Sequence, residues 1–349
     1  MITDASTIAL AAPLAALCVS ALLTLMLARS PQLLPGLVDE ANDRSLHAGA
    51  IPRTGGVAVL CAIATAAAIA AATLPMAGVW AWVAVAATPV AAVSLLDDRR
   101  HVKPGYRLAA QAAGAGILVA GGVTWSPVEV PGLAVTPAPL LVYPLSLLFV
   151  VWMVNLYNFM DGMDGFAAGM TLFGFGALAL IGWQAGDLPF AALSAAVAAA
   201  GAGFLAGNFP PARIFLGDMG SATLGLLAAA VSLLGAHRGL FPLWAAWLAF
   251  SPFIVDATWT LLRRLLRREP VWQAHRSHHY QRLVLAGWTH RRTVLRAYLL
   301  MAACAATAVA APGMSVLDQW LLLGAWACIY ALIGYKTRLV ERQAGLGSP

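Results

Sequence analysis

Long apolar runs recur along the whole chain and constrain its fold more than any other feature. A membrane-spanning helix needs about 20 predominantly apolar residues. Such runs lie near residues 8–28, 55–74, 79–96, 107–124, 138–157, 165–183, 189–207, 220–236, 240–262, 294–311 and 317–335. Only 10% of the 349 residues are charged, whereas a soluble domain carries about 25%. The sequence therefore predicts an all-α, polytopic integral membrane protein with about 11 transmembrane helices.

Basic residues fall almost entirely on one side of this predicted topology. All but one of the 21 Lys and Arg residues lie in loops or tails of one side, and Arg238 is the exception. Because Lys and Arg concentrate in cytoplasmic loops, we expect the N-terminus outside and the C-terminus in the cytoplasm. The net charge of +6 thus indicates topology and does not indicate a nucleic-acid partner.

The loops are too short to hold a separate soluble domain, so residues 1–349 are predicted to form a single transmembrane domain. Most of the 15 Asp and Glu residues also lie on the cytoplasmic side, several at the ends of spans. Carboxylates at a membrane boundary are costly unless they are paired or bind a cation. We therefore expect a functional face built from the cytoplasmic loops 29–54, 97–107, 158–165, 208–220 and 263–293.

Asp97 and Asp98 end the third predicted span. Adjacent carboxylates repel each other and raise one pKa unless a cation compensates. A divalent ion would do so and would leave one carboxylate able to act as a base or to position a nucleophile. The alternative is a helix end that meets water and pairs with Arg99, Arg100 or Lys103.

Two further segments concentrate Asn, Asp and Gly where spans meet the cytoplasm. They read Asn155-Leu-Tyr-Asn158-Phe-Met-Asp161-Gly-Met-Asp164-Gly165 and Gly207-Asn208-Phe-Pro-Pro-Ala-Arg213-Ile-Phe-Leu-Gly217-Asp218-Met-Gly220-Ser221. Residues three apart are neighbours on a helix, so the first segment forms a polar stripe. Hard oxygen ligands suit Mg²⁺, and Asn side chains both donate and accept hydrogen bonds. Polar helix–helix contacts and a simple turn are the respective alternatives.

The last cytoplasmic loop contains His275-Arg-Ser-His278-His279-Tyr-Gln-Arg282 after a run of arginines. Anchoring on anionic lipid would explain the arginines alone. For the histidines, contact with phosphate is favoured over zinc binding, because the acids of the cytoplasmic loops suit magnesium better.

The sequence resembles the polyprenyl-phosphate N-acetylhexosamine-1-phosphate transferases, glycosyltransferase family 4. The residues that carry the resemblance are Arg53-Thr-Gly55-Gly56, Asp97-Asp98, the two polar segments and the histidine-rich loop. The resemblance implies that undecaprenyl phosphate attacks the β-phosphorus of a UDP-N-acetylhexosamine. The sugar 1-phosphate moves to the lipid, and UMP leaves. It also implies Mg²⁺ as cofactor, with Mn²⁺ as a second candidate, and a bacterial inner membrane location with the active site on the cytoplasmic face.

The resemblance further implies roles for individual residues. Asp97 and Asp98 would be catalytic, with Asp97 deprotonating or orienting the lipid phosphate. Asp218 and Asp98 would bind the metal. The residues implied to bind the nucleotide and sugar are Arg53, Asn158, Asp161, Asp164, Asn208, His278 and His279. Those implied to bind the lipid phosphate are Arg276 and Arg282.

Two positions depart from the family pattern. His101 stands where an acid or Asn is common, and Arg276 replaces the first histidine of a His-x-His-His loop. The second departure, with the eleven spans and the cytoplasmic tail, favours the branch that starts O-antigen synthesis on N-acetylglucosamine or a 6-deoxy relative. Peptidoglycan lipid I synthesis is the alternative within the superfamily, and a cation-coupled transporter the alternative outside it. The expected partners are the UDP-sugar, undecaprenyl phosphate and membrane lipids, with a homodimer left open.

Overall fold

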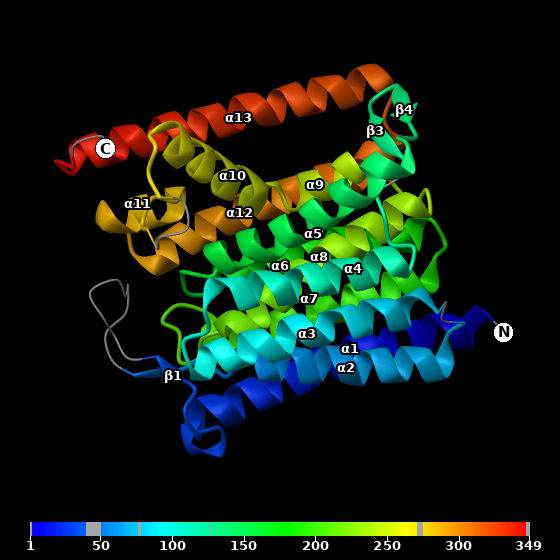
Figure 1. Ribbon diagram of the computed structural model, residues 1–349, viewed down its shortest axis with the longest axis horizontal. Coiled ribbons are helices and arrows are strands. Elements are labelled where there is room, and N and C mark those ends of the chain that lie inside the picture. The colour runs from blue at the N-terminus through cyan, green and yellow to red at the C-terminus, as the bar shows by residue number, and fades with distance from the viewer. Residues whose placement is uncertain (1, 40–49, 76–77, 126, 271–274, 347–349) are drawn as a thin grey trace.

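The computed structural model describes residues 2–39, 50–75, 78–125, 127–270 and 275–346. The predicted loops 29–54 and 263–293 therefore lie partly outside the described residues. Long helices run side by side and end at two opposite faces (Figure 1). The elements are α1 (Ile2–Arg29), η1 (Pro31–Leu33), β1 (Val38–Asp39), β2 (Ile51–Pro52), α2 (Gly55–Thr73), α3 (Val79–Arg99), α4 (Pro104–Ala120), β3 (Val128–Val130), β4 (Leu133–Val135), α5 (Pro139–Met160), α6 (Phe166–Gln184), α7 (Leu188–Asn208), α8 (Gly217–His237), α9 (Leu243–Ala249), α10 (Ser251–Leu266), α11 (His279–Leu285), α12 (His290–Ala310), η2 (Ala311–Gly313) and α13 (Val316–Gln343).

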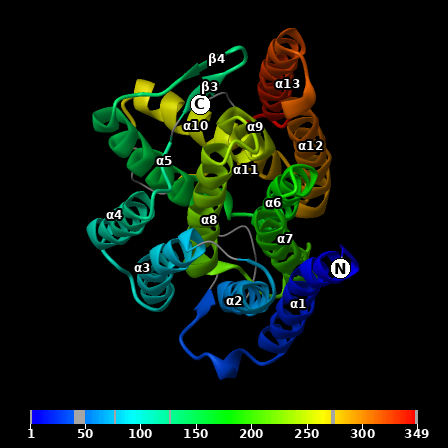
Figure 2. The same ribbon diagram turned by 90° about the vertical axis from the view of Figure 1, so that its right-hand side faces the viewer.

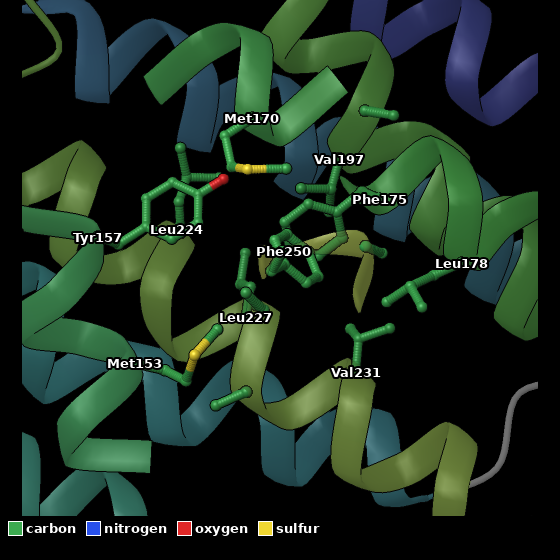
Figure 3. Packing of buried hydrophobic residues seen from close by; sticks show 14 of the residues in the cluster. Met153, Tyr157, Met170, Phe175, Leu178, Val197, Leu224, Leu227, Val231 and Phe250 are labelled. Carbon is green, nitrogen blue, oxygen red and sulfur yellow. The ribbon is translucent and has the colours of Figure 1, made fainter. Parts of the chain in front are cut away.

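Helix α8 forms the centre of the bundle (Figure 2). Every residue from Gly220 to Ala236 is buried. Small residues allow the close packing that membrane helices rely on. At Gly225, for example, a Cβ atom would lie 2.5 Å from the carbonyl oxygen of Met153 in α5. Figure 3 shows side chains of α5, α6, α7 and α8 gathered around Phe250. By contrast, α13 lies at the edge of the bundle and buries few of its residues.

The prediction of a polytopic, all-helical membrane protein is confirmed. Among the described residues, nine helices are long and apolar enough to cross a membrane, and the bent pair α9 and α10 raises the number to as many as ten. The remaining predicted span, 107–124, corresponds to α4, which is only 17 residues long. The strands form two short antiparallel pairs, β1 with β2 and β3 with β4, in the loops.

The ninth predicted span, 240–262, is divided between two helices. Helices α9 and α10 meet at Phe250 with a bend of 85°. Pro252 follows the break and has no N–H group, so the helical ladder cannot run through it unbroken. Helix α10 buries Asp256 and Arg264 on one face and exposes apolar residues, among them Leu262 and Leu266, on another.

The loops that carry the polar motifs lie at the same end of the bundle. Strand β1, helix α11 and the end of α13 lie on the left of Figure 1, whereas the start of α1 and the β3–β4 hairpin lie on the right. Because α3, α5 and α7 all run toward the left and α8 starts there, their connecting loops gather on one face.

Candidate active site

The start of α2 and the loop before α8 are joined through their backbones. The N–H of Gly56 donates to the carbonyl oxygen of Leu216 at 2.7 Å. A Cβ atom on Gly56 would lie 2.5 Å from the backbone nitrogen of Gly220, so this approach requires glycine. The contact brings Arg53 to the start of α8, within electrostatic reach of Asp98.

Asp98 lies in the last turn of α3 and caps the N-terminus of α8. Its Oδ1 accepts the N–H of Asp218 at 2.8 Å, and its Oδ2 accepts the N–H of Met219 at 2.9 Å. The first N–H groups of a helix lack partners within the helix, and the helix dipole favours a negative charge there. Gly217 adopts a φ of 74°, and a Cβ atom there would lie 2.9 Å from Asp98 Oδ2. Asp98 therefore fixes the position of the Asp218 backbone.

Arg107, in the first turn of α4, links Asp97 to Asp218. Its Nη1 lies 2.7 Å from Asp97 Oδ2 and 3.7 Å from Asp218 Oδ2. The N–H of Val102 donates to Asp97 Oδ1 at 2.8 Å. The Asp97 side chain is only 6% exposed, so this carboxylate is enclosed between a guanidinium and a backbone donor. The acidic pair does meet a basic side chain, but that side chain comes from the next helix.

Asn158 completes the polar cluster from the end of α5. Its Nδ2 donates to Asp218 Oδ1 at 2.9 Å, and its Oδ1 accepts from Arg107 Nη2 at 3.4 Å. Nearer the middle of α5, the Nδ2 of Asn155 donates to Gln111 Oε1 at 2.7 Å. The polar stripe therefore divides: Asn155 joins α5 to α4, and Asn158 contacts the carboxylate.

Asp161 lies just after α5 and belongs to the same electrostatic cluster. Desolvation raises the pKa of its carboxyl group well above the usual range, and the negative charges of Asp218 and Asp98 raise this pKa further. The guanidinium of Arg53 acts in the opposite direction. Carboxylates that raise one another's pKa in this way favour the binding of a cation among them.

Asp164 and Asn208 connect the loop between α5 and α6 with the loop between α7 and α8. Asp164 Oδ2 accepts the N–H of Ala212 at 3.1 Å, and its Oδ1 lies 3.3 Å from His290 Nδ1. Burial raises the pKa of Asp164, but these bonds outweigh burial, and the pKa is lowered overall. Asn208 Oδ1 accepts the N–H of Gly165 at 2.9 Å, and its Nδ2 donates to a backbone carbonyl of the following loop at 2.9 Å. Both side chains therefore hold the loops after α5 and α7 in place beside the site.

The histidine motif lies against the loop that follows α5. The hydroxyl of Tyr280 donates to the carbonyl oxygen of Phe159 at 3.3 Å, and its ring packs on Phe166 with centroids 4.9 Å apart. His278 is buried and His279 half-buried. The histidine motif therefore lies next to the carboxylate cluster, and Tyr280 connects the motif to the end of α5.

The two arginines predicted to bind the lipid phosphate have different surroundings. Arg276 is half-buried in the segment before α11. Arg282 is buried, and its Nε and Nη2 donate to the two carboxylate oxygens of Glu341 in α13. The structure thus gives Arg282 a role in joining α11 to α13, and its contact with lipid phosphate stays a prediction.

The structure brings half of the predicted site residues together in one cluster. Those that form the cluster are Arg53, Asp97, Asp98, Asn158, Asp161 and Asp218. Arg107 and Gln111 were not among the predicted site residues, and Asp256 was recognised only as a carboxylate inside a predicted span, without a specific role. The sequence signal that could have identified Arg107 was its position one turn into the helix that follows Asp97 and Asp98.

The donor set of the cluster fits a hard divalent cation. Asp218, Asp161 and Asn158 provide carboxylate and amide oxygens, which Mg²⁺ prefers. Within the described residues, no group of three or more His, Cys, Asp or Glu side chains is arranged to hold a metal ion by itself. Mg²⁺ usually keeps several waters and binds through one or two carboxylates together with substrate phosphates, so the arrangement is compatible with a metal that arrives with a diphosphate.

The chain is similar in sequence to known proteins. The sequence profile of glycosyl transferase family 4 matches residues 80–236. The probable undecaprenyl-phosphate N-acetylglucosaminyl 1-phosphate transferase of Bacillus subtilis is 32% identical over 268 residues, covering 76% of this chain and 74% of that protein. The decaprenyl-phosphate N-acetylglucosaminephosphotransferase of Mycobacterium tuberculosis H37Rv is 32% identical over 298 residues, covering 76% and 73%.

A third relative aligns over more of the chain. The undecaprenyl-phosphate alpha-N-acetylglucosaminyl 1-phosphate transferase of Escherichia coli K12 is 27% identical over 315 residues, covering 86% of this chain and 83% of that protein. The matched profile includes α3, α5 and the start of α8, which carry the acidic cluster. The chain therefore belongs to glycosyl transferase family 4, the polyprenyl-phosphate hexosamine-1-phosphate transferases.

Proposed function

We propose that this chain transfers N-acetylhexosamine 1-phosphate from a UDP-sugar to undecaprenyl phosphate, releasing UMP and forming undecaprenyl-diphosphate-sugar. The observation that carries the proposal is the convergence of Asp97, Asn158 and Asp218 around Arg107, with Asp161 in electrostatic contact with Asp218. UDP-N-acetylglucosamine is the first donor to test, because the relatives' names specify N-acetylglucosamine.

The reaction exchanges one phosphorus–oxygen bond for another. An oxygen of the lipid phosphate forms a bond to the β-phosphorus of the donor, and the bond from that phosphorus to the bridging oxygen breaks. The bridging oxygen leaves with UMP. Catalysis of such a transfer depends on positioning and charge neutralisation. A phosphate monoester loses its second proton near pH 6, so the lipid phosphate needs orientation more than it needs a base.

The arrangement of the cluster assigns these tasks to particular side chains. Asp97 is enclosed against Arg107, so we assign it the role of holding that guanidinium toward the phosphates. Asp98 holds the first turn of α8 and thereby places Asp218. Asn158 donates a hydrogen bond to the Asp218 carboxylate and thereby orients it.

The same cluster would hold Mg²⁺ through Asp218, with Asp161 nearby. When bound, the metal would neutralise the negative charge of the donor diphosphate. Asp98, the other predicted ligand, has both oxygens engaged by backbone N–H groups, so we propose that its contribution is to position Asp218.

The proposal includes the eleven-span topology, with the N-terminus outside and the site at the cytoplasmic face of a bacterial inner membrane. Helix α4 would be the remaining span. Its 17 residues give a length of roughly 25 Å, and the apolar residues that follow it extend this toward the bilayer thickness. The product would start O-antigen or another cell-surface polysaccharide. A transporter is disfavoured, because the acids gather at one face and not near the bilayer midplane.

The experiment is UMP release by the purified chain in detergent. We expect release from UDP-N-acetylglucosamine only when both undecaprenyl phosphate and Mg²⁺ are present, and loss of release in excess EDTA. A screen of other UDP-N-acetylhexosamines, including UDP-N-acetylmuramoyl-pentapeptide, separates the O-antigen branch from the peptidoglycan branch. Release without the lipid, or undiminished release in EDTA, would contradict the proposal.

A further inference from the structure

A carboxylate outside the acidic cluster holds the histidine motif in place. Asp256 lies inside α10, and only 8% of the residue is exposed. A carboxylate enclosed within a membrane helix is costly unless partners compensate for the loss of water. Its partners come mainly from the histidine motif, which is in a different segment of the chain.

The contacts converge on both carboxylate oxygens of Asp256. The N–H of His279 lies 3.0 Å from Oδ1 and 3.1 Å from Oδ2, and its ring Nδ1 lies 3.0 Å from Oδ1. The Nδ1 of His278 lies 3.4 Å from the same Oδ1. Thr260, one turn further along α10, donates its hydroxyl to Oδ1 at 3.2 Å. Asp256 thus holds the backbone and the ring of His279, and the ring of His278 lies within ion-pair distance of the same oxygen.

A carboxylate beside Nδ1 determines what an imidazole can do at its other nitrogen. It keeps a proton on Nδ1, fixes the orientation of the ring and compensates a positive charge if the ring is doubly protonated. The Nε2 atom is then left for a second contact, and in His279 this atom faces α13, where a Cβ atom on Gly334 would lie 3.7 Å from it. Without the carboxylate, the ring is free to change tautomer and rotamer.

The ordered rings are coupled to the loop that carries the donor-side residues. His278 stacks on Tyr280 with an interplanar angle of 9° and centroids 6.0 Å apart. Tyr280 in turn contacts the backbone of Phe159, which lies between Asn158 and Asp161. An orientation set at Asp256 therefore reaches the part of the site where the UDP-sugar is proposed to bind.

We propose that Asp256 is a positioning residue that holds His278 and His279, and through Tyr280 the 158–165 loop, in the arrangement that binds the UDP-sugar. The proposal rests on the function proposed above. It assigns the effect to the donor and not to the lipid acceptor, because the motif contacts the 158–165 loop.

The test compares Asp256→Asn, His279→Ala and the double variant, measuring UMP release with the UDP-N-acetylglucosamine and undecaprenyl phosphate concentrations varied separately. We expect Asp256→Asn to raise the KM for the UDP-sugar at least tenfold and to change the KM for the lipid less than twofold. Because Asp256 acts partly through His279, the increase in the donor KM of the double variant is expected to be smaller than the product of the increases in the two single variants. Asp256→Glu, which keeps the charge, should restore part of the affinity.

Asp187→Asn is the matched control. Asp187 also pairs with a basic side chain, Arg238, at 2.8 Å, but it lies at the opposite end of the bundle, so both KM values should stay unchanged. The proposal is overturned if Asp256→Asn keeps the wild-type KM for the donor, if the lipid KM rises instead, or if the losses of the two single variants multiply. If Asp256→Asn fails to fold, the donor KM of Asp256→Glu is compared with those of the wild type and of His279→Ala. A wild-type value then overturns the proposal, and a value between the two supports it. An inactive wild-type chain would instead contradict the proposed function.

Discussion

The ion pair between Arg282 and Glu341 offers the sharpest separation of a structural role from a substrate-binding role. The two side chains join α11 to α13, and each is only 6% exposed. The informative changes are Glu341→Gln, which removes one charge, and the double change Arg282→Met with Glu341→Leu, which replaces the pair by apolar side chains.

The expected magnitude follows from the burial of the pair. Removing one partner of a buried ion pair costs about 3–5 kcal/mol, because an uncompensated charge remains, whereas replacing both partners by apolar residues is often neutral. At roughly 2 °C per kcal/mol for a chain of this size, Glu341→Gln should lower the apparent Tm by about 6–10 °C. The double variant should recover most of this loss.

The assay is thermal unfolding in detergent, followed by tryptophan fluorescence, with UMP release measured on the same samples at 25 °C. If Arg282 is structural, the double variant retains both its Tm and its turnover. If the double variant keeps its Tm but loses turnover, Arg282 contacts a substrate, as the family resemblance implies. An unchanged Tm for Glu341→Gln would refute the reasoning from burial.

Three further predictions concern the cluster and the topology. Asp218→Ala should lower the turnover number at least 100-fold, or about 2.7 kcal/mol for a lost electrostatic contact, and a near-wild-type rate of UMP release would remove it from the site. Asp98→Asn should lower the turnover and also the Tm, because an amide donor would face a backbone donor of α8 at a cost of about 1.5–3 kcal/mol; loss of turnover with an unchanged Tm would contradict the capping role. In a variant without the native cysteines, an impermeant thiol reagent should label a cysteine at His101 from the cytoplasm and one at Glu129 from outside, and the reverse pattern would refute the topology.

The class of fold and the types of residue in the site could be predicted from the sequence alone. Hydropathy is a local property, so each apolar run could be recognised from its own residues, and the charged loops between the runs indicated which helix ends belong together. Asp97, Asn158 and Asp218 could be selected in the same way, because each polar residue stands out against an apolar surrounding at a predicted membrane boundary.

The groups that these residues contact could be identified only from the folded structure. Asp98 and Asp218 are 120 positions apart, so no local pattern could show that one caps the helix of the other. The pairing of Asp97 with Arg107, the bend between α9 and α10 and the attachment of His279 to Asp256 likewise depend on how neighbouring helices pack. Hydrogen bonds and ion pairs act over a few ångströms in space, whereas sequence patterns record only order along the chain.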